Sequence, residues 1–233
     1  GDGRYLLVMA EEISSLPKDR TLDPAQLAAF VQRRQPLYDK AQESHYNLIS
    51  ALHKSLRGSD CDAALYWFAR MCAGGEDPRY IARRLTRFAS EDVGLADPQA
   101  LPLALAAWEA YERMGSPEGE LALAELVIYL ATAPKSNAAY IAIGAAQRAA
   151  KEYGSLMPPK HILNAPTKLM QEIGYGEGYE YDHDSAEGFS GQNYFPDDMK
   201  REQFYRPVER GFEREVKKRL DYWADLRRKR ETK

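Results

Sequence analysis

Three apolar stretches decide the fold: LPLALAAWEAYERM (residues 101–114), ELALAELVIYLA (120–131) and NAAYIAIGAAQRAA (137–150). Each is rich in Ala and Leu on nearly all sides, and no convincing run alternates with a period of two. A helix that is apolar all round is typically buried. The sequence therefore predicts an all-α protein in which these three helices form the buried centre.

Helix starts are marked by Asp or Ser followed directly by Pro. Such a side chain accepts hydrogen bonds from the free N–H groups of the first turn, and Pro fits the first helical position because it has no N–H to leave unpaired. These dipeptides are Asp23-Pro24, Asp77-Pro78, Asp97-Pro98 and Ser116-Pro117, while Gly115 and Gly154 stand where helices should stop. Together with the helical periodicity, they predict helices at 3–15, 24–35, 44–56, 60–73, 78–92, 98–114, 117–133, 136–153, 160–173 and 207–230.

Composition narrows the class of protein. With 233 residues, 29% charged residues and a mean hydropathy of -0.58, the chain should be soluble and ordered, as one large domain or two small ones. A net charge of -3 excludes a histone-like polycation, and no apolar run approaches the ~20 residues of a membrane span. No signal peptide is recognisable, and two cysteines suggest a reducing compartment. Because the first residue is Gly, we expect a piece of a longer protein.

A change in composition near residue 174 predicts a long surface loop followed by a basic helix. Residues 174–198 are acidic, rich in Gly and Tyr, and free of Lys and Arg. From Lys200 onward, thirteen Lys and Arg stand against seven Asp and Glu. Opposite charges on neighbouring segments indicate intramolecular pairing as readily as a ligand site.

Motifs for independent chemistry are missing. Before Lys135-Ser136, the two glycine positions of a phosphate loop hold Tyr129 and Pro134, so a turn with Ser136 as N-cap is the better reading. The GYGEGY run at 174–179 follows a helix and not a strand, which excludes a dinucleotide fingerprint. No His or Cys pair has zinc spacing, no Ser or Cys sits in a nucleophile elbow, and we expect His183 to be solvated or hydrogen bonded and not a metal ligand.

A row of arginines is the strongest candidate site. Arg79, Arg83 and Arg87 recur every four residues, opposite an apolar face, with Arg84 beside them. Guanidinium groups suit phosphates because each presents a planar fork of donors. Salt bridges to nearby carboxylates are an equally simple explanation. Lys54 and Arg57 add a second basic turn, where helix capping by Ser59 or Asp60 competes as an explanation.

Several longer blocks resemble a known family. They are HYNLISALHKSLRGSDCDAALYWFARM (45–71), GEDPRYIARRLTRFASEDVGLADPQAL (75–101), APKSNAAY (133–140), GYGEGYEYDHD (174–184) and QNYFP (192–196). These blocks resemble the C-terminal half of the bacterial replication-associated recombination protein A family. These proteins are clamp-loader-type AAA+ ATPases related to the eukaryotic Werner-helicase-interacting protein.

The resemblance implies a division into residues 1–38, a remnant of the AAA+ helical lid, and residues 39–233, a clamp-loader-like helical collar that forms homotetramers. Gly1–Arg4 resembles the sensor-2 segment, so Arg4 is expected to contact nucleotide phosphates in the full-length protein. ATP and Mg²⁺ belong to a core that this sequence does not contain, so no catalysis is expected of this chain alone.

The family also implies a setting: DNA with single-strand/double-strand junctions at stalled forks, in replication, recombination and repair. Single-strand-binding protein and the replication machinery would be partners, in the cytoplasm at the nucleoid and away from membranes. Two other readings stay open. One is a stand-alone helical enzyme with an acidic pocket in the 174–198 loop, and the other is a scaffold whose arginines only form salt bridges.

Overall fold

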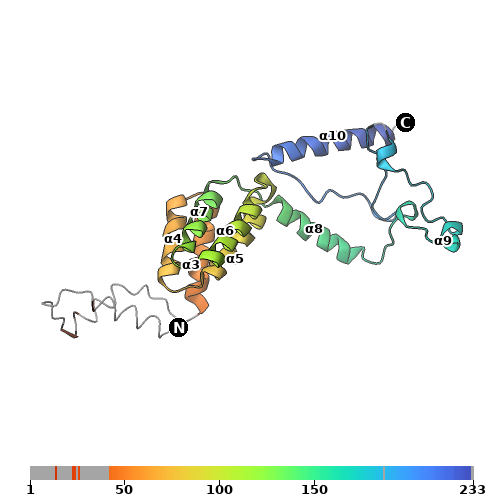
Figure 1. Ribbon diagram of the computed structural model, residues 1–233. Helices are drawn as coiled ribbons and strands as arrows, with labels where there is room; N and C mark the ends of the chain where they lie inside the picture. The colour runs from red at the N-terminus through yellow and green to blue at the C-terminus, as the bar shows by residue number, and fades with distance from the viewer. Residues whose placement is uncertain (1–13, 15–22, 25, 27–41, 186, 232–233) are drawn as a thin grey trace. The chain divides into compact units, whose positions relative to one another are not determined.

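The computed structural model describes Ser14, Asp23, Pro24 and Gln26, and then residues 42–185 and 187–231. In this part of the chain every regular element is a helix, which confirms the all-α fold. The α-helices are α3 (Gln42–Arg57), α4 (Cys61–Ala73), α5 (Pro78–Phe88), α6 (Ala100–Met114), α7 (Gly119–Thr132), α8 (Ala138–Glu152), α9 (Lys168–Glu172) and α10 (Glu213–Glu231) (Figure 1). Tighter or wider turns are the π-turn η1 (Ala89–Val93) and the 3-10 turns η2 (Gly94–Ala96), η3 (Lys160–Ile162) and η4 (Asp182–Asp184).

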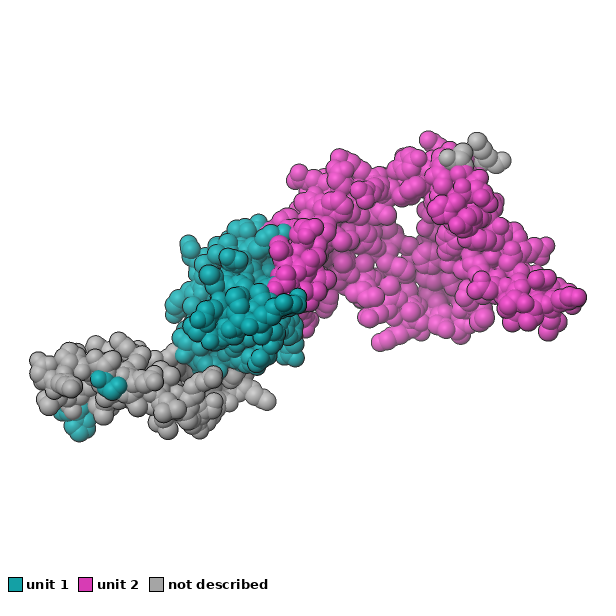
Figure 2. All heavy atoms as spheres, in the orientation of Figure 1, with its two compact units in different colours: residues 1–85, 107–132 teal, residues 86–106, 133–233 magenta. Residues whose placement is uncertain are grey.

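The chain divides into two compact units (Figure 2). Unit 1 consists of residues 1–85 and 107–132, and unit 2 of residues 86–106 and 133–233. Helices α5 and α6 contribute residues to both units. The expected boundary between residues 38 and 39, and most of the helices expected at 3–15 and 24–35, lie outside the described residues.

Unit 1 has an apolar core of its own, in which α3, α4 and α7 pack against one another. Fully burying one large aliphatic side chain stabilises a fold by about 1.5–3 kcal/mol. This core buries many of them, so α7 has one face in the core, as its sequence predicts, while Leu121 and Ile128 on it stay exposed. The largest fully buried side chains here are Ile49, Leu52, Leu56, Met71, Ile81, Leu85, Leu123, Val127 and Leu130.

Most of the expected helix starts are capped as predicted. Asp60 Oδ1 accepts from the Ala63 N–H at 3.0 Å, and Asp77 Oδ1 accepts from the Arg79 N–H at 2.9 Å. Asp23 and Gln26 exchange hydrogen bonds between side chain and backbone, as in a capping box.

Ser116-Pro117 does not start its helix, because α7 begins at Gly119. The Ser116 hydroxyl is engaged elsewhere, 3.2 Å from the Tyr111 hydroxyl. Gly119 also touches the preceding helix so closely that a Cβ there would lie 2.9 Å from the Tyr111 Cα. The close approach of these two segments, and not local capping, sets where the helix begins.

Helices α6 and α8 both differ from the prediction of a buried centre. On α6 only Ala100, Ala104 and Tyr111 are buried, and its leucines Leu101, Leu103 and Leu105 are at least 40% exposed.

On α8, Tyr140, Ile141 and Ile143 are 54–55% exposed, and of its residues only Ala138 and Ala149 are buried. After Ala138, the described part of the chain buries no apolar residue except Ala149 and Pro159. The segment after Ala138 therefore leaves most of this helix uncovered.

Two other helices are shorter than predicted. Residues 160–173 form the turn η3, a non-helical stretch and then α9, because the residue before a proline is driven out of the helical region and Pro166 interrupts the segment. Residues 207–212 do not join α10. Gly211 has a φ of 50°, and a Cβ there would lie 2.0 Å from the Ala96 carbonyl oxygen.

Candidate functional site

The first arginine of the row lies in a fixed ion pair within unit 1. Arg79 Nε is 2.7 Å from Glu112 Oε1, and its Nη2 donates to Glu112 Oε2 at 3.0 Å, so the pair is bidentate. The Trp108 indole N–H donates to the same carboxylate at 3.2 Å. These bonds raise the pKa of Arg79 and lower the pKa of Glu112 from their ordinary values.

The other arginines differ in their surroundings. Arg87, in unit 2, pairs with Glu91 at 2.6 Å, which raises the pKa of its guanidinium. The exposed Arg83 guanidinium lies over the Tyr80 ring at 5.3 Å, and the Nε of the half-buried Arg84 is buried without a hydrogen-bond partner.

The second basic turn lies at the end of α3. Lys54 and Arg57 occupy the last turn of that helix, and both are exposed. The cap of the next helix is Asp60, while Ser59 takes a φ of 58° in the turn between the two helices. Capping thus explains Asp60 but gives no role to the two cations.

The structure supplies partners for the salt-bridge explanation of Arg79 and Arg87. Exposed ion pairs stabilise by only about 0–1 kcal/mol, so a phosphate can replace a carboxylate partner at little cost. The role of the six cations in DNA binding stays a prediction. Arg4, the expected nucleotide sensor, lies outside the described residues.

A buried carboxylate in unit 2 is a site that the sequence did not reveal. Glu213, the first residue of α10, is fully buried. It accepts hydrogen bonds from the Ser136 hydroxyl at 2.7 Å, the Tyr205 hydroxyl at 2.7 Å and the Val208 N–H at 2.9 Å. Burial, with the bond to Glu213, raises the pKa of Tyr205. Of the residues in this network, only Ser136 was singled out from the sequence, as an expected N-cap.

Ser136 was predicted as the N-cap of the next helix, but the N-cap of α8 is Asn137 and Ser136 lies one residue before it. The Ser136 hydroxyl accepts from the Ala138 N–H at 3.2 Å, at the start of α8, while it also donates to Glu213. The adjoining Lys135 is half-buried, and desolvation lowers the pKa of its ammonium. The Arg210 guanidinium bonds to the Lys135 carbonyl oxygen at 3.2 Å. This buried network ties the segment before α8 to the start of α10.

An apolar groove runs beside the network. Its volume is about 350 Å³. Its floor is α8 and its wall is the non-helical segment that carries Tyr205. No charged residue lines it. The lining residues are Leu95, Ala139, Ala142, Ile143, Ala146, Phe204 and Tyr205.

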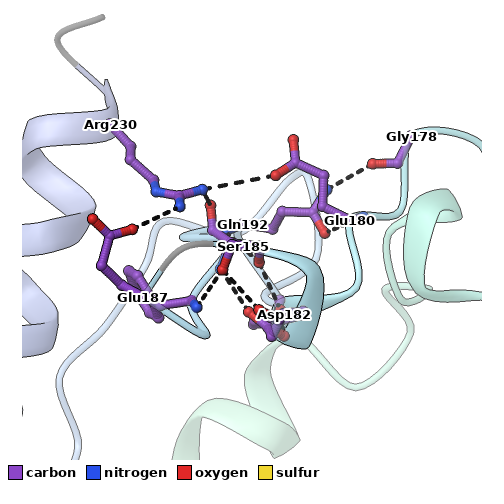
Figure 3. Close-up of polar contacts among 10 residues, drawn as sticks. Gly178, Glu180, Asp182, Ser185, Glu187, Gln192 and Arg230 are labelled. Carbon is purple, nitrogen blue, oxygen red and sulfur yellow. Dashed lines mark hydrogen bonds and ion pairs between the residues drawn. The ribbon is translucent and has the colours of Figure 1, made fainter.

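The acidic loop and α10 are paired, which is one of the two possibilities that their opposite charges left open (Figure 3). Arg230 donates to the Ser190 carbonyl oxygen at 2.7 Å and lies 3.5 Å from Glu187 and 3.8 Å from Glu180. Within the loop, Asp182 accepts from the Ser190 N–H at 2.7 Å, and this bond is the main cause of its lowered pKa.

Of the loop's tyrosines, Tyr194 donates to Asp182 at 3.0 Å, while Tyr179 and Tyr181 are about half exposed. An open cleft of about 600 Å³ lies between the loop and α10, with Glu180, Glu187 and Arg230 in its lining. Their mutual pairing makes these carboxylates poor candidates for proton transfer.

Among the described residues, no three His, Cys, Asp or Glu side chains are grouped so that they could hold a metal ion. No helix in that same part of the chain is long and apolar enough to cross a membrane.

Residues 58–224 match the family model MgsA AAA+ ATPase C terminal, and residues 1–57 match the model AAA C-terminal domain. The chain belongs to the family of MgsA AAA+ ATPase C-terminal domains, which confirms the resemblance noted in the sequence.

Individual relatives agree. The chain is 46% identical over 237 residues to Replication-associated recombination protein A of Coxiella burnetii, covering 100% of this chain and 54% of the relative. Identity to the Escherichia coli protein of the same name is 45% over 231 residues, covering 97% of this chain and 52% of the relative. ATPase WRNIP1 of Dictyostelium discoideum is 42% identical over 197 residues, 82% of this chain and 22% of the relative. The chain thus spans about half the length of the bacterial relatives.

Proposed function

We propose that this chain is the assembly region of a AAA+ ATPase and that it joins four copies into a tetramer that presents basic side chains to DNA. The family supports a place in DNA replication and recombination. More specifically, the protein would act in the repair of stalled replication forks, at junctions of single- and double-stranded DNA. Its partners would be single-strand-binding protein and the replication machinery. In this proposal the protein works in the cytoplasm, at the nucleoid, without a membrane contact.

The exposed apolar side chains of α8 carry the proposal of assembly. Tyr140, Ile141 and Ile143 are all more than half exposed, on a helix with small residues between them. Leaving such side chains in water forgoes about 25 cal/mol for each Å² that a partner would cover. A second copy of the chain would cover them, and the mass of the chain in solution is the direct test.

Catalysis belongs to the rest of the ATPase in this proposal. ATP and Mg²⁺ would be bound by a nucleotide-binding core that this sequence does not contain, and Arg4 would reach the nucleotide phosphates from the lid. The chain alone would then have no turnover. An enzyme in the acidic loop is a weaker alternative, because Glu180, Glu187 and Asp182 are already engaged by Arg230 and the loop backbone.

The DNA surface rests on Arg83, Arg84 and Arg87 of α5, together with Arg79, Lys54 and Arg57. One row binds phosphates weakly, but copies linked by assembly act together because linkage raises their effective concentration. A scaffold without DNA contacts is the second candidate. The pairs Arg79–Glu112 and Arg87–Glu91 favour it, because they give two of these arginines a structural role.

One double variant separates the two candidates. Changing Arg83→Ala with Arg87→Ala should weaken binding to a duplex with a single-stranded tail similarly for all sequences. It should also flatten the slope of log affinity against log salt by roughly 1–2 units per protomer engaged, since each phosphate contact contributes about 0.7–0.9. The matched control is Arg113→Ala with Arg228→Ala, which removes two exposed, ion-paired arginines outside the row. A lower melting temperature with unchanged DNA affinity would leave the row as structural.

A further inference from the structure

Helix α10 is strongly basic, and the proposed function gives this charge no role. From Arg214 to Arg230 the helix carries eight Lys and Arg against three Asp and Glu. Arg230 pairs with the acidic loop on one side of the helix (Figure 3). The cations on the other side of the helix need a different explanation.

The inner side of α10 is occupied by the acidic loop. The Trp223 ring lies 5.0 Å from the Phe189 ring of the loop, and the Arg227 guanidinium lies over the same ring at 5.2 Å. Arg230 donates to the Ser190 carbonyl oxygen at 2.7 Å. All three helix residues are half-buried, so this side has little surface left for a ligand.

The opposite side of α10 is exposed and carries a basic stripe of four side chains. Residues spaced four, four and seven apart lie along one side of a helix, because these spacings are close to whole turns. The stripe consists of Arg214, Lys218, Tyr222 and Lys229, all of them exposed. At about 1.5 Å per residue it is about 22 Å long.

The carboxylates beside the basic stripe are held by cations of the same helix. Exposed ion pairs of this kind are weak, so a phosphate can replace a carboxylate partner at little cost. Arg214 Nε donates to the Glu209 carbonyl oxygen at 3.0 Å, a group without a charge to neutralise it. The three pairs are Glu215–Lys218 and Asp221–Lys217, each at 2.8 Å, and Asp225–Arg228.

Tyr222 places an aromatic ring within the basic stripe. It is 51% exposed, and its ring packs edge-on against the Trp223 ring, with centroids 5.0 Å apart and an angle of 68° between the planes. Trp223 is held in turn by Phe189. The Tyr222 ring is therefore positioned, while its exposed half can stack on a flat partner.

The mixture of cations and an aromatic ring restricts the ligand. Proteins that bind single-stranded nucleic acid use cations that follow the backbone phosphates and aromatic rings on which bases stack. A duplex keeps its bases stacked on one another, so it would leave the Tyr222 ring unused. An acidic peptide would satisfy the cations but brings no base to the ring.

We propose that the basic stripe of α10 is a binding site for single-stranded nucleic acid. Arg214, Lys218 and Lys229 contact backbone phosphates, and Tyr222 stacks on an unpaired base. The site goes beyond the proposed function, because it depends neither on the arginine row of α5 nor on assembly.

The first test changes the ring alone. Tyr222→Ser removes it and Tyr222→Phe keeps it, and fluorescence anisotropy measures the affinity for a short labelled thymidine oligonucleotide and for its duplex with the complementary strand. Tyr222→Ser should weaken single-strand binding about fivefold or more and leave duplex binding unchanged, because one stacked base is lost. Tyr222→Phe should bind both like the parent chain. Repeating the series with Arg83→Ala and Arg87→Ala present separates α10 from the arginine row.

The second test concerns the phosphate contacts. Lys218→Ala with Lys229→Ala should flatten the slope of log affinity against log salt by roughly 1–1.5 units, since each contact to a single strand contributes about 0.7. The matched control is Lys151→Ala with Lys168→Ala, which removes two exposed lysines of α8 and α9 and should leave the slope unchanged. The helical content of every variant should match the parent chain.

Two results would overturn this inference. Equal single-strand affinity of Tyr222→Ser and the parent chain would show that no base stacks there. Displacement of the oligonucleotide by polyglutamate as readily as by unlabelled oligonucleotide would assign the basic stripe to an acidic protein. Either result would leave the arginine row and the assembly standing.

Discussion

Glu213 is the residue on which the second unit depends most. Its carboxylate is fully buried and is satisfied by three neutral donors, the Ser136 and Tyr205 hydroxyls and the Val208 N–H. These donors come from two segments, the turn before α8 and the groove wall, so one side chain at the start of α10 holds both of them. The cost of burying a charge is offset only while all three bonds are made.

Removing this acceptor should destabilise the fold. Glu213→Ala leaves three buried donors without a partner and should lower the free energy of unfolding by about 3 kcal/mol. Ser136→Ala removes one donor and should cost about 1 kcal/mol. Glu215→Ala is the control, because that exposed carboxylate pairs only along its own helix with Lys218. Urea unfolding at one fixed protein concentration measures all three, and equal stability of the Glu213 and Glu215 variants would refute the role.

Individual residues also show what the sequence can reveal. Asp60 and Asp77 cap their helices as their types predict, because a cap is a local interaction over two or three residues. Glu213 could not be found in this way, since its partners lie five, eight and 77 residues away and nothing in its neighbourhood distinguishes it from the exposed Glu209 or Glu215.

At the scale of elements, the acidic loop and α10 form one structure. Arg230 reaches the Ser190 carbonyl oxygen, Glu187 and Glu180, while Asp182 and Gln192 organise the loop behind them. The opposite charges of the two segments indicated such a pairing or, equally, a ligand site. Which arginine would form it was not predictable, because α10 carries basic residues on all sides.

Arg230→Ala should free the loop without unfolding the helix. Amide hydrogen exchange at residues 180–190 should become about three- to tenfold faster, since partly exposed contacts of this kind stabilise by about 1 kcal/mol. Arg228→Ala is the matched control, because its partner Asp225 lies on the same helix. Equal protection of the loop in both variants would show that Arg230 does not hold it.

The three apolar stretches, which are similar in composition, differ in how far they are buried. All three form helices. Helix α7 has one face in the core, whereas α6 exposes Leu101, Leu103 and Leu105, and α8 exposes Tyr140, Ile141 and Ile143. Composition predicts that a helix must be covered, not which molecule covers it. The prediction of one helix over residues 160–173 was wrong for a different reason, because Pro166 outweighs the helical propensity of its neighbours.

At the scale of the whole molecule, the two units differ in how many apolar side chains each one buries. Unit 1 buries a full apolar core between α3, α4 and α7. Unit 2 is held after Ala138 largely by polar contacts, at Glu213 and at Arg230, with exposed apolar side chains on α8. Ordering each residue costs about 1–2 kcal/mol of backbone entropy, and apolar burial is the main term that offsets it. In our account, contact with further copies of the chain supplies that burial.

The mass of the chain in solution tests this account most directly. Light scattering coupled to size exclusion, at several loading concentrations up to tens of micromolar, should give an assembly of four times the 26.4 kDa chain, with dissociation only on dilution. A tetramer would supply the further copies of the chain that the account requires to cover the exposed side chains of α8. A mass of one chain at every concentration would contradict it.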